Sequence, residues 1–344
     1  MNNISKTIQE KRKLKLHNKA NHPICQLKEK IQSYFNDFTA FDHLNEVVST
    51  KDNFDDLLIP ANHPARSMND TYYVDENHVL RTHTSAHQNQ LLRQGHAKFI
   101  VTGDVYRKDT IDKTHYPVFH QMEGVKIVPD GTDPLVDLKN TLEGLIKYLY
   151  PGKAYRFLND YFPFTHPSLQ VEVKQGAEWM EVLGAGVIQP KILENCQIEG
   201  QAWAFGLGID RLLLSYCNIP DIRYLWTLDA RFINQFKKGL TTFKEYSKYP
   251  PVIKDVSFWV NQYVETDESQ WEQHNNFCEI IREIGQDLIE NVSLIDKFNK
   301  FDKTSLAYRI TYRSNDRTLL NSEINDIQMN IRNEITEKFD IELR

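Results

Sequence analysis

The clearest pattern in the chain is a pair of apolar runs separated by a polar one. Residues 99–106 are apolar and rich in β-formers, 107–115 are almost wholly polar, and 117–128 are again extended in character. Apolar runs of this length bounded by polar segments are typical of strands. We therefore expect two antiparallel strands joined by a long charged loop.

Other segments show helical or alternating spacing. Helices are predicted at residues 22–35, with Asn21 as the cap and Pro23 in the first turn, at 137–150 and at 209–217. Extended segments are predicted at 72–80, 168–174 and 178–183, the last two as a hairpin about Gly176, and 52–70 is predicted as a loop. The resulting fold class is α+β, an antiparallel sheet with flanking helices.

After Pro250 and Pro251 the pattern starts again. The order is strand 255–260, helix 267–284, strands 292–298 and 306–313, helix 322–337 and strand 339–343. This order is the βαββαβ ferredoxin-like unit. At 344 residues the chain exceeds one typical core, so we expect an N-terminal extension and helix (1–50), a larger domain (51–235), a linker (236–248) and the ferredoxin-like domain (249–344).

Composition narrows the class of protein. The charged fraction is 26% and the hydrophobic fraction 40%, values of an ordinary globular protein, and no apolar run is long enough for a membrane span. The four cysteines form no CxxC or Cys/His pair, which argues against both a disulfide framework and a structural zinc site. The net charge of −6 means that any nucleic acid must meet a local basic surface.

Four segments carry the candidate chemistry. They are Arg81-Thr-His-Thr-Ser-Ala-His-Gln88, Gly103-Asp-Val-Tyr-Arg107, Phe119-His-Gln-Met-Glu123 and Ala204-Phe-Gly-Leu-Gly-Ile-Asp-Arg211. In order and spacing they resemble the single-chain, mitochondrial type of phenylalanyl-tRNA synthetase, a class II aminoacyl-tRNA synthetase. The resemblance runs from about residue 22 to the end of the chain and implies a class II catalytic domain followed by an anticodon-binding domain.

Two arginines are expected to act on ATP. Amino-acid activation brings a carboxylate to the α-phosphate, and a guanidinium can bind both anions through paired hydrogen bonds. The resemblance makes Arg107 the motif 2 arginine on the carboxylate and α-phosphate, and Arg211 the motif 3 arginine on the γ-phosphate and adenine. Asp210 stands where relatives have Glu, so the charge is kept.

The resemblance also implies the remaining ATP contacts and the metal. Phe119 would stack on adenine, and the end of the charged loop would touch ATP through Thr114, His115 and Tyr116. Glu181 matches the carboxylate that holds Mg²⁺ on the phosphates, and Mg²⁺ needs few carboxylates when phosphate oxygens complete its shell.

Strand alternation places Phe119, Gln121 and Glu123 on one face, with His120 and Met122 on the other. In the resembled family this region receives the amino acid. The expected substrate-binding residues are His83, Ser85, Ala86, His87, Gln88, Gln121, Met122, Glu123, Phe162, Phe164, Ala204 and Phe205. Phe162 and Phe164 resemble the pair of rings that pack on a phenylalanine side chain, and Ala204 and Gly186 resemble the floor of its pocket.

Within 306–313 the even positions are apolar and the odd positions include two arginines. The resemblance to an anticodon-binding domain predicts tRNA contacts from Lys254, Arg309 and Arg313, whereas exposed basic residues alone are more often simply solvated.

The prediction is ATP-dependent attachment of L-phenylalanine to tRNA(Phe) by a monomer, with ATP as substrate, Mg²⁺ as cofactor and no membrane partner. The rivals are a synthetase-derived RNA- or amino-acid-binding protein without aminoacylation, and a class II enzyme for another amino acid. The basic first twenty residues fit either a mitochondrial presequence remnant or a solvated helix. The expected location is the mitochondrial matrix, with the cytoplasm as alternative.

Overall fold

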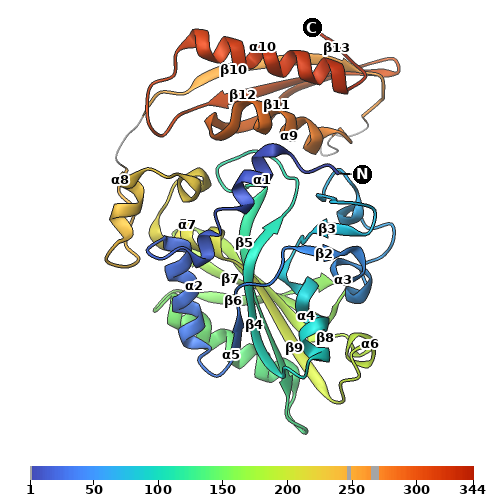
Figure 1. The fold of residues 1–344 in the computed structure, drawn as a ribbon, viewed down its shortest axis with the longest axis vertical. Coiled ribbons are helices and arrows are strands. Elements are labelled where there is room, and N and C mark those ends of the chain that lie inside the picture. Colours follow the sequence, from blue (N-terminus) through green and yellow to red (C-terminus); the bar gives the residue numbers. More distant parts are fainter. Residues whose placement is uncertain (1, 246–248, 265–270) are drawn as a thin grey trace.

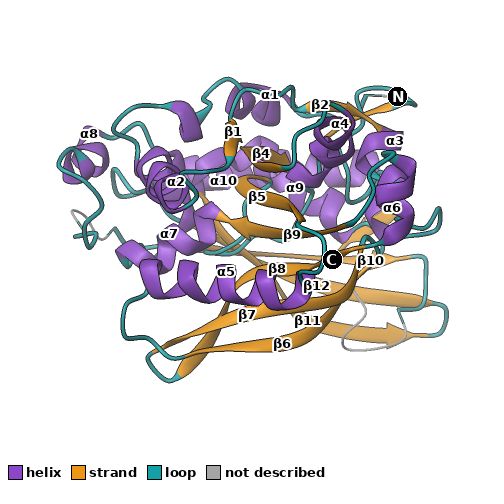
Figure 2. Cartoon of the chain, turned by 90° about the horizontal axis from the view of Figure 1, so that it is seen from below, coloured by secondary structure: helices purple, strands orange, loops and turns teal. Residues whose placement is uncertain are grey.

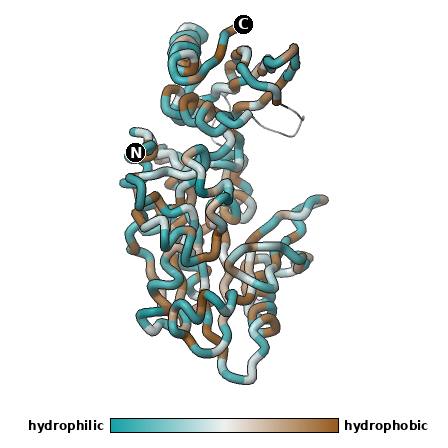
Figure 3. Tube along the Cα trace, turned by 90° about the vertical axis from the view of Figure 1, so that its right-hand side faces the viewer, coloured by the Kyte–Doolittle hydropathy of each residue, from teal (hydrophilic) through white to brown (hydrophobic). Residues whose placement is uncertain are grey.

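The computed structural model describes residues 2–245, 249–264 and 271–344. The described chain forms two units, a larger one built on a seven-stranded sheet and a smaller one built on a four-stranded sheet (Figure 1). The side view in Figure 3 shows the two units one above the other. Part of the predicted linker 236–248, residues 246–248, lies outside the described residues, and the predicted domain limits stay predictions.

The seven-stranded sheet has the order β1-β4-β5-β9-β8-β7-β6. Its strands are β1 (Thr39–Phe41), β4 (Lys98–Tyr106), β5 (Val118–Val128), β6 (Tyr155–Phe162), β7 (Thr165–Gln175), β8 (Glu178–Ile188) and β9 (Gln201–Gly208). All neighbours are antiparallel except the edge strand β1, which pairs parallel with β4. A separate two-stranded ribbon joins β2 (Val47–Ser49) to β3 (His78–Leu80). The predicted α+β class is thus confirmed.

Helices cover both faces of this sheet (Figure 2). The larger unit contains α1 (Lys6–Arg12), α2 (Pro23–Tyr34), α3 (Thr50–Asn53), α4 (Gln88–Arg93), α5 (Pro134–Leu149), α6 (Pro190–Asn195), α7 (Ile209–Cys217) and α8 (Ala230–Ile233). Helix α2 contacts both α5 and α7, while α7 contacts β5 and α5 contacts β8 and β9. Their apolar faces belong to the main core, which also includes Ile8 of α1.

The smaller unit has the predicted βαββαβ order. Its elements are β10 (Val252–Val260), α9 (His274–Gly285), β11 (Ile289–Lys300), β12 (Lys303–Tyr312), α10 (Asn321–Lys338) and β13 (Ile341–Leu343). The strand order β11-β12-β10-β13 with two helices on one face is the ferredoxin-like arrangement. Helix α9 begins at His274, and the start predicted at residue 267 lies outside the described residues.

Several local predictions need correction. Helix α2 is capped by the side chain of His22, because Asn21 has a left-handed backbone with φ of 66° and cannot occupy the extended cap position. Helix α5 begins a turn earlier than predicted, since the carboxylate of Asp133 accepts the amide hydrogens of Leu135 and Val136. The predicted loop 52–70 contains short helical turns, and strands β1, β6 and β9 were not predicted.

The four cysteines are buried, and each has a free thiol. Among the described residues, no helix combines the length and the apolar character that crossing a membrane requires.

Ile8 anchors α1 in the main core, so shortening this one side chain should lower the stability of the larger unit strongly. Ile8 is fully buried, so Ile8→Ala should lower the free energy of unfolding of the larger unit by about 2–5 kcal/mol, measured by urea denaturation. Ile253→Ala is the control, because Ile253 is 52% exposed and its loss should change that value by no more than about 0.5 kcal/mol. Equal effects of the two substitutions would contradict the packing of α1.

Candidate active site

A cavity of 820 Å³ lies over strands β5, β8 and β9. The predicted site residues that line it are Arg107, Arg211, Glu181, His83, Ser85, Gln121, Glu123, Phe162, Phe164, Ala204, Phe205, Thr114, His115, Tyr116 and Phe119. They come from separate stretches of sequence between residues 83 and 211. The fold therefore gathers most of the predicted residues around one space.

The register of β5 explains why the two arginines meet. Val118 of β5 lies opposite Tyr106, the last residue of β4, and Gln121 lies opposite Gly208, the last residue of β9. Arg107 follows β4 directly, and Arg211 is in the first turn of α7 after β9. Both arginines therefore leave the sheet at the same end of β5.

Both guanidinium groups are available to an anion. Both side chains are exposed on the cavity wall, and in the described part of the chain neither pairs with a carboxylate. Arg107 Nε donates to the carbonyl oxygen of Thr82 at 2.8 Å, and its guanidinium lies 5.3 Å from the centre of the Phe119 ring. These contacts orient Arg107 without neutralising its charge.

Glu123 provides a buried carboxyl group at the other end of the site. It is 2% exposed, and Ser85 Oγ donates a short hydrogen bond to its Oε2. Burial raises the pKa of Glu123 to about 8, against the opposing hydrogen bonds from Ser85 and Thr84. A cation placed beside this carboxyl would favour its ionised form.

His83 lies next to this carboxyl region as a neutral ring. Burial, with a smaller contribution from the charge of Arg107, lowers its pKa to about 3. Its ring is tilted against Phe164 with 6.3 Å between the ring centres. Gln121 Oε1 accepts the backbone amide of Thr84 at 3.2 Å, which fixes the short turn that carries His83.

An aromatic wall closes another side of the cavity. Phe162 and Phe164 are nearly parallel, with ring centres 5.8 Å apart and 13° between the planes. Gly184 of β8 makes room for this wall, because a Cβ there would lie 2.7 Å from the Phe162 ring. Gly184 was not predicted, because the strand expected at 178–183 stops before it, although Gly184 and Gly186 stand two residues apart in the sequence.

Glu181 is an exposed carboxylate on β8 that faces the cavity. Within the described ranges it makes no ion pair, so its oxygens are free to bind a cation. Carboxylate oxygens are ligands that suit Mg²⁺.

Four predicted substrate-binding residues do not line the cavity, and these assignments are corrected. Met122 lies on the opposite face of β5, fully buried in the main core. Ala86 packs in an apolar cluster with Val48 and Phe54. The His87 ring accepts a hydrogen bond from Arg81 Nη1 at 2.9 Å.

Gln88, the fourth of them, begins α4 and donates from its side-chain amide to Asn89 Oδ1 at 3.2 Å. In this run of sequence Thr82, His83 and Ser85 line the cavity, whereas Ala86, His87 and Gln88 are buried in the protein.

The charged loop after β4 is held by the smaller unit, which the sequence did not predict. Ile111 is buried in the hydrophobic core of the smaller unit, and its carbonyl accepts the amide of Val292 at 2.9 Å. Tyr116 lines the cavity, and its hydroxyl donates to Asp287 Oδ1 at 2.8 Å. Contacts between the units therefore fix the loop that carries the predicted ATP-binding residues.

The three predicted tRNA-binding residues do not form one basic surface. Lys254 lies opposite Ile310, a core residue, so it is on the helix-facing side of the sheet, away from Arg309 and Arg313. Arg309 forms a paired contact with Asp255 on the open face. Arg313 donates to Glu290 Oε2 at 2.6 Å and to the carbonyl of Tyr249 at 3.0 Å. This register contradicts the prediction that Lys254 lies on one surface with the two arginines.

Comparison with known proteins gives the same two units. A family model described as tRNA synthetases class II core domain (F) matches residues 6–236, and one described as ferredoxin-fold anticodon binding domain matches residues 247–344.

Relatives match over almost the whole chain. A chloroplastic/mitochondrial phenylalanine–tRNA ligase of Arabidopsis thaliana is 48% identical, covering 100% of this chain and 83% of its own length. Mitochondrial phenylalanine–tRNA ligases of Dictyostelium discoideum and Saccharomyces cerevisiae are 42% and 35% identical, covering 99% of this chain and 89% and 92% of their own lengths. The chain belongs to the class II tRNA synthetases, in the family of the organellar phenylalanine–tRNA ligases.

Proposed function

We propose that this protein attaches L-phenylalanine to tRNA(Phe) in two steps, with phenylalanyl-adenylate as the intermediate. The observation that carries the proposal is the convergence of Arg107 and Arg211 on the cavity that also holds buried Glu123. Neither guanidinium has a carboxylate partner among the described residues. These groups suit an amino acid and a nucleotide triphosphate bound side by side. Family membership and the names of the relatives support the same reaction.

Catalysis in this proposal is positioning and charge stabilisation. The phenylalanine carboxylate attacks the α-phosphorus of ATP and displaces pyrophosphate, so the attacking group needs no general base. Arg107 reduces the repulsion between the two anions, and Arg211 binds the leaving phosphates and covers adenine on the side away from Phe119. Mg²⁺ held by Glu181 would add positive charge at the phosphates.

The amino acid is oriented from both ends. Its ammonium would lie at Glu123 with support from Gln121 and Ser85, and its ring would pack on Phe162 and Phe164 above the small residues of β8 and β9. In the second step a terminal hydroxyl of tRNA attacks the adenylate carbonyl and releases AMP. We place this activity in the mitochondrial matrix, in line with the relatives' names, and infer a monomer because one chain carries both units.

Pyrophosphate exchange across the amino acids, followed by charging of tRNA(Phe), tests this function. Phenylalanine should support the fastest exchange and should be transferred to tRNA(Phe). Faster exchange with another amino acid would indicate a different class II enzyme, and exchange without transfer would indicate an activity limited to adenylate formation.

Arg211 should be required for adenylate formation. Arg211→Ala removes the guanidinium from the phosphates and should lower kcat for pyrophosphate exchange by roughly 100-fold or more, with the fold unchanged by circular dichroism. Arg231→Ala is the matched control, because Arg231 is an exposed arginine whose guanidinium pairs with Asp229 outside the cavity. Retained exchange in Arg211→Ala would remove its assigned role.

Glu123 should make phenylalanine binding depend on pH. Only the ionised carboxylate attracts the ammonium, and burial keeps the pKa of Glu123 at about 8 in the free protein. KM for phenylalanine should therefore fall between pH 6.5 and 8, by up to about tenfold per pH unit, as the ionised fraction rises.

In Glu123→Gln the KM should be higher and this pH dependence should be absent. A wild-type KM that stays constant over the same interval would contradict the assigned role of Glu123.

The aromatic pocket should discriminate only modestly against tyrosine. An apolar site rejects a substrate that merely adds a hydroxyl by about a hundredfold. Tyrosine-dependent exchange should therefore be measurable, with kcat/KM about 100-fold below that for phenylalanine. Complete absence of tyrosine activation would show that the pocket holds an additional discriminating group.

A further inference from the structure

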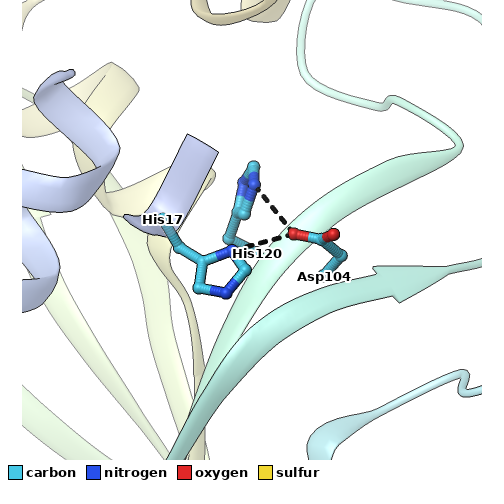
Figure 4. Close-up of side chains that lie close together, drawn as sticks. All are labelled: His17, Asp104 and His120. Atoms are coloured by element: carbon cyan, nitrogen blue, oxygen red, sulfur yellow. Dashed lines mark ion pairs between the residues drawn. The ribbon is translucent and has the colours of Figure 1, made fainter. Parts of the chain in front are cut away.

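A second cluster of ligand-type side chains lies on the other face of β5 from the cavity. His17 comes from the short helical turn Leu16–Asn18, Asp104 from β4 and His120 from β5, and all three point toward one another (Figure 4). Their exposed fractions are 3%, 1% and 0%. The proposed aminoacylation uses none of them.

The three facing atoms are close to one another but are not aligned for hydrogen bonding. His17 Nδ1 lies 2.9 Å and His120 Nε2 lies 3.3 Å from the same oxygen, Asp104 Oδ1. Within the described part of the chain, these three buried atoms have no hydrogen-bond partner of acceptable geometry. Nitrogen and oxygen ligands about 2.0–2.1 Å from a tetrahedral ion would lie about 3.3 Å apart, with their lone pairs directed at the ion instead of at each other.

The ring nitrogens that face away from the cluster have hydrogen-bond partners typical of metal-binding histidines. His17 Nε2 lies 3.1 Å from the carbonyl oxygen of Asp42, which can only accept, so this nitrogen carries the hydrogen and Nδ1 is left with a lone pair. His120 Nδ1 lies 3.0 Å from Asp210 Oδ2, a carboxylate that orients the ring in the same way. Metal-binding histidines usually donate their second N–H to a carbonyl or carboxylate.

Asp104 is the third candidate ligand of the cluster. Its Oδ2 accepts a hydrogen bond from Lys15 Nζ at 2.8 Å, while Oδ1 faces the two imidazoles. The lysine holds the carboxylate in place and leaves one oxygen for a further cation.

We propose that His17, Asp104 and His120 form a binding site for Zn²⁺, with a water molecule as the fourth ligand of a tetrahedral shell. Two imidazoles and one carboxylate are ligands that Zn²⁺ prefers, whereas Mg²⁺ requires an octahedral shell of oxygens. The ion would join the N-terminal segment to β4 and β5. Through Asp210 it would also brace the start of α7, next to Arg211.

In the alternative interpretation no metal is bound, and a protonated histidine between carboxylates holds the cluster together. Burial lowers the pKa of His120, but without a metal the carboxylates of Asp210 and Asp104 outweigh burial and raise it to about 9. In that case His120 is an imidazolium between two carboxylates and cannot bind a metal. Metal content separates the two accounts.

The test uses the untagged full chain, stripped with a chelator, reloaded with Zn²⁺ and passed through gel filtration. Elemental analysis should find about one zinc per chain in the wild type and at least tenfold less in His17→Ala. The control His78→Ala should retain the wild-type zinc content, because His78 is an exposed histidine that pairs with Asp75. A wild type without retained zinc, or zinc retained equally in His17→Ala, would overturn the site.

Substitution with Co²⁺ keeps the proposal testable if His17→Ala does not fold. A tetrahedral cobalt site in the wild-type protein should give strong visible absorption bands. The weak bands of an octahedral ion, or no bound cobalt, would overturn the proposal without affecting the proposed aminoacylation.

Discussion

The structure depends on the pairing of strand β5 with β4 on one side and β9 on the other. This register sets the end of the sheet at which Arg107 and Arg211 emerge, and the alternation of β5 side chains separates two environments. Phe119, Gln121 and Glu123 face the cavity, whereas His120 and Met122 face the interior. A shift of one residue in this pairing would exchange the two sets and remove the site.

Much of this arrangement could be read from the sequence. The period-two pattern of β5 predicted which of its residues face the substrate, and the motif spacing predicted the two arginines. The errors arose where a residue was assigned because of its neighbours in sequence. Met122 was included although alternation places it in the core, and Lys254 was grouped with arginines from which the pairing with Ile310 separates it.

The missed features depend on contacts between distant segments. Strand β6 is mostly exposed and lacks regular alternation, so no pattern marked it. Strand β9 was not predicted, because its pairing with β5 and β8 is not visible in the segment alone. Likewise, Ile111 is an isolated apolar residue in a polar loop until the smaller unit supplies the core that buries it.

The parallel strand β1 has a consequence for the sheet as a whole. It covers the outer side of β4, whose nine residues are almost all buried, with three residues of its own. A short edge strand offers little backbone for pairing with another molecule, whereas a long apolar one is a template for aggregation. Residues 39–41 therefore shield the outer edge of β4, and a shortened form beginning after Phe41 would leave the backbone of this buried strand open to pairing with other chains.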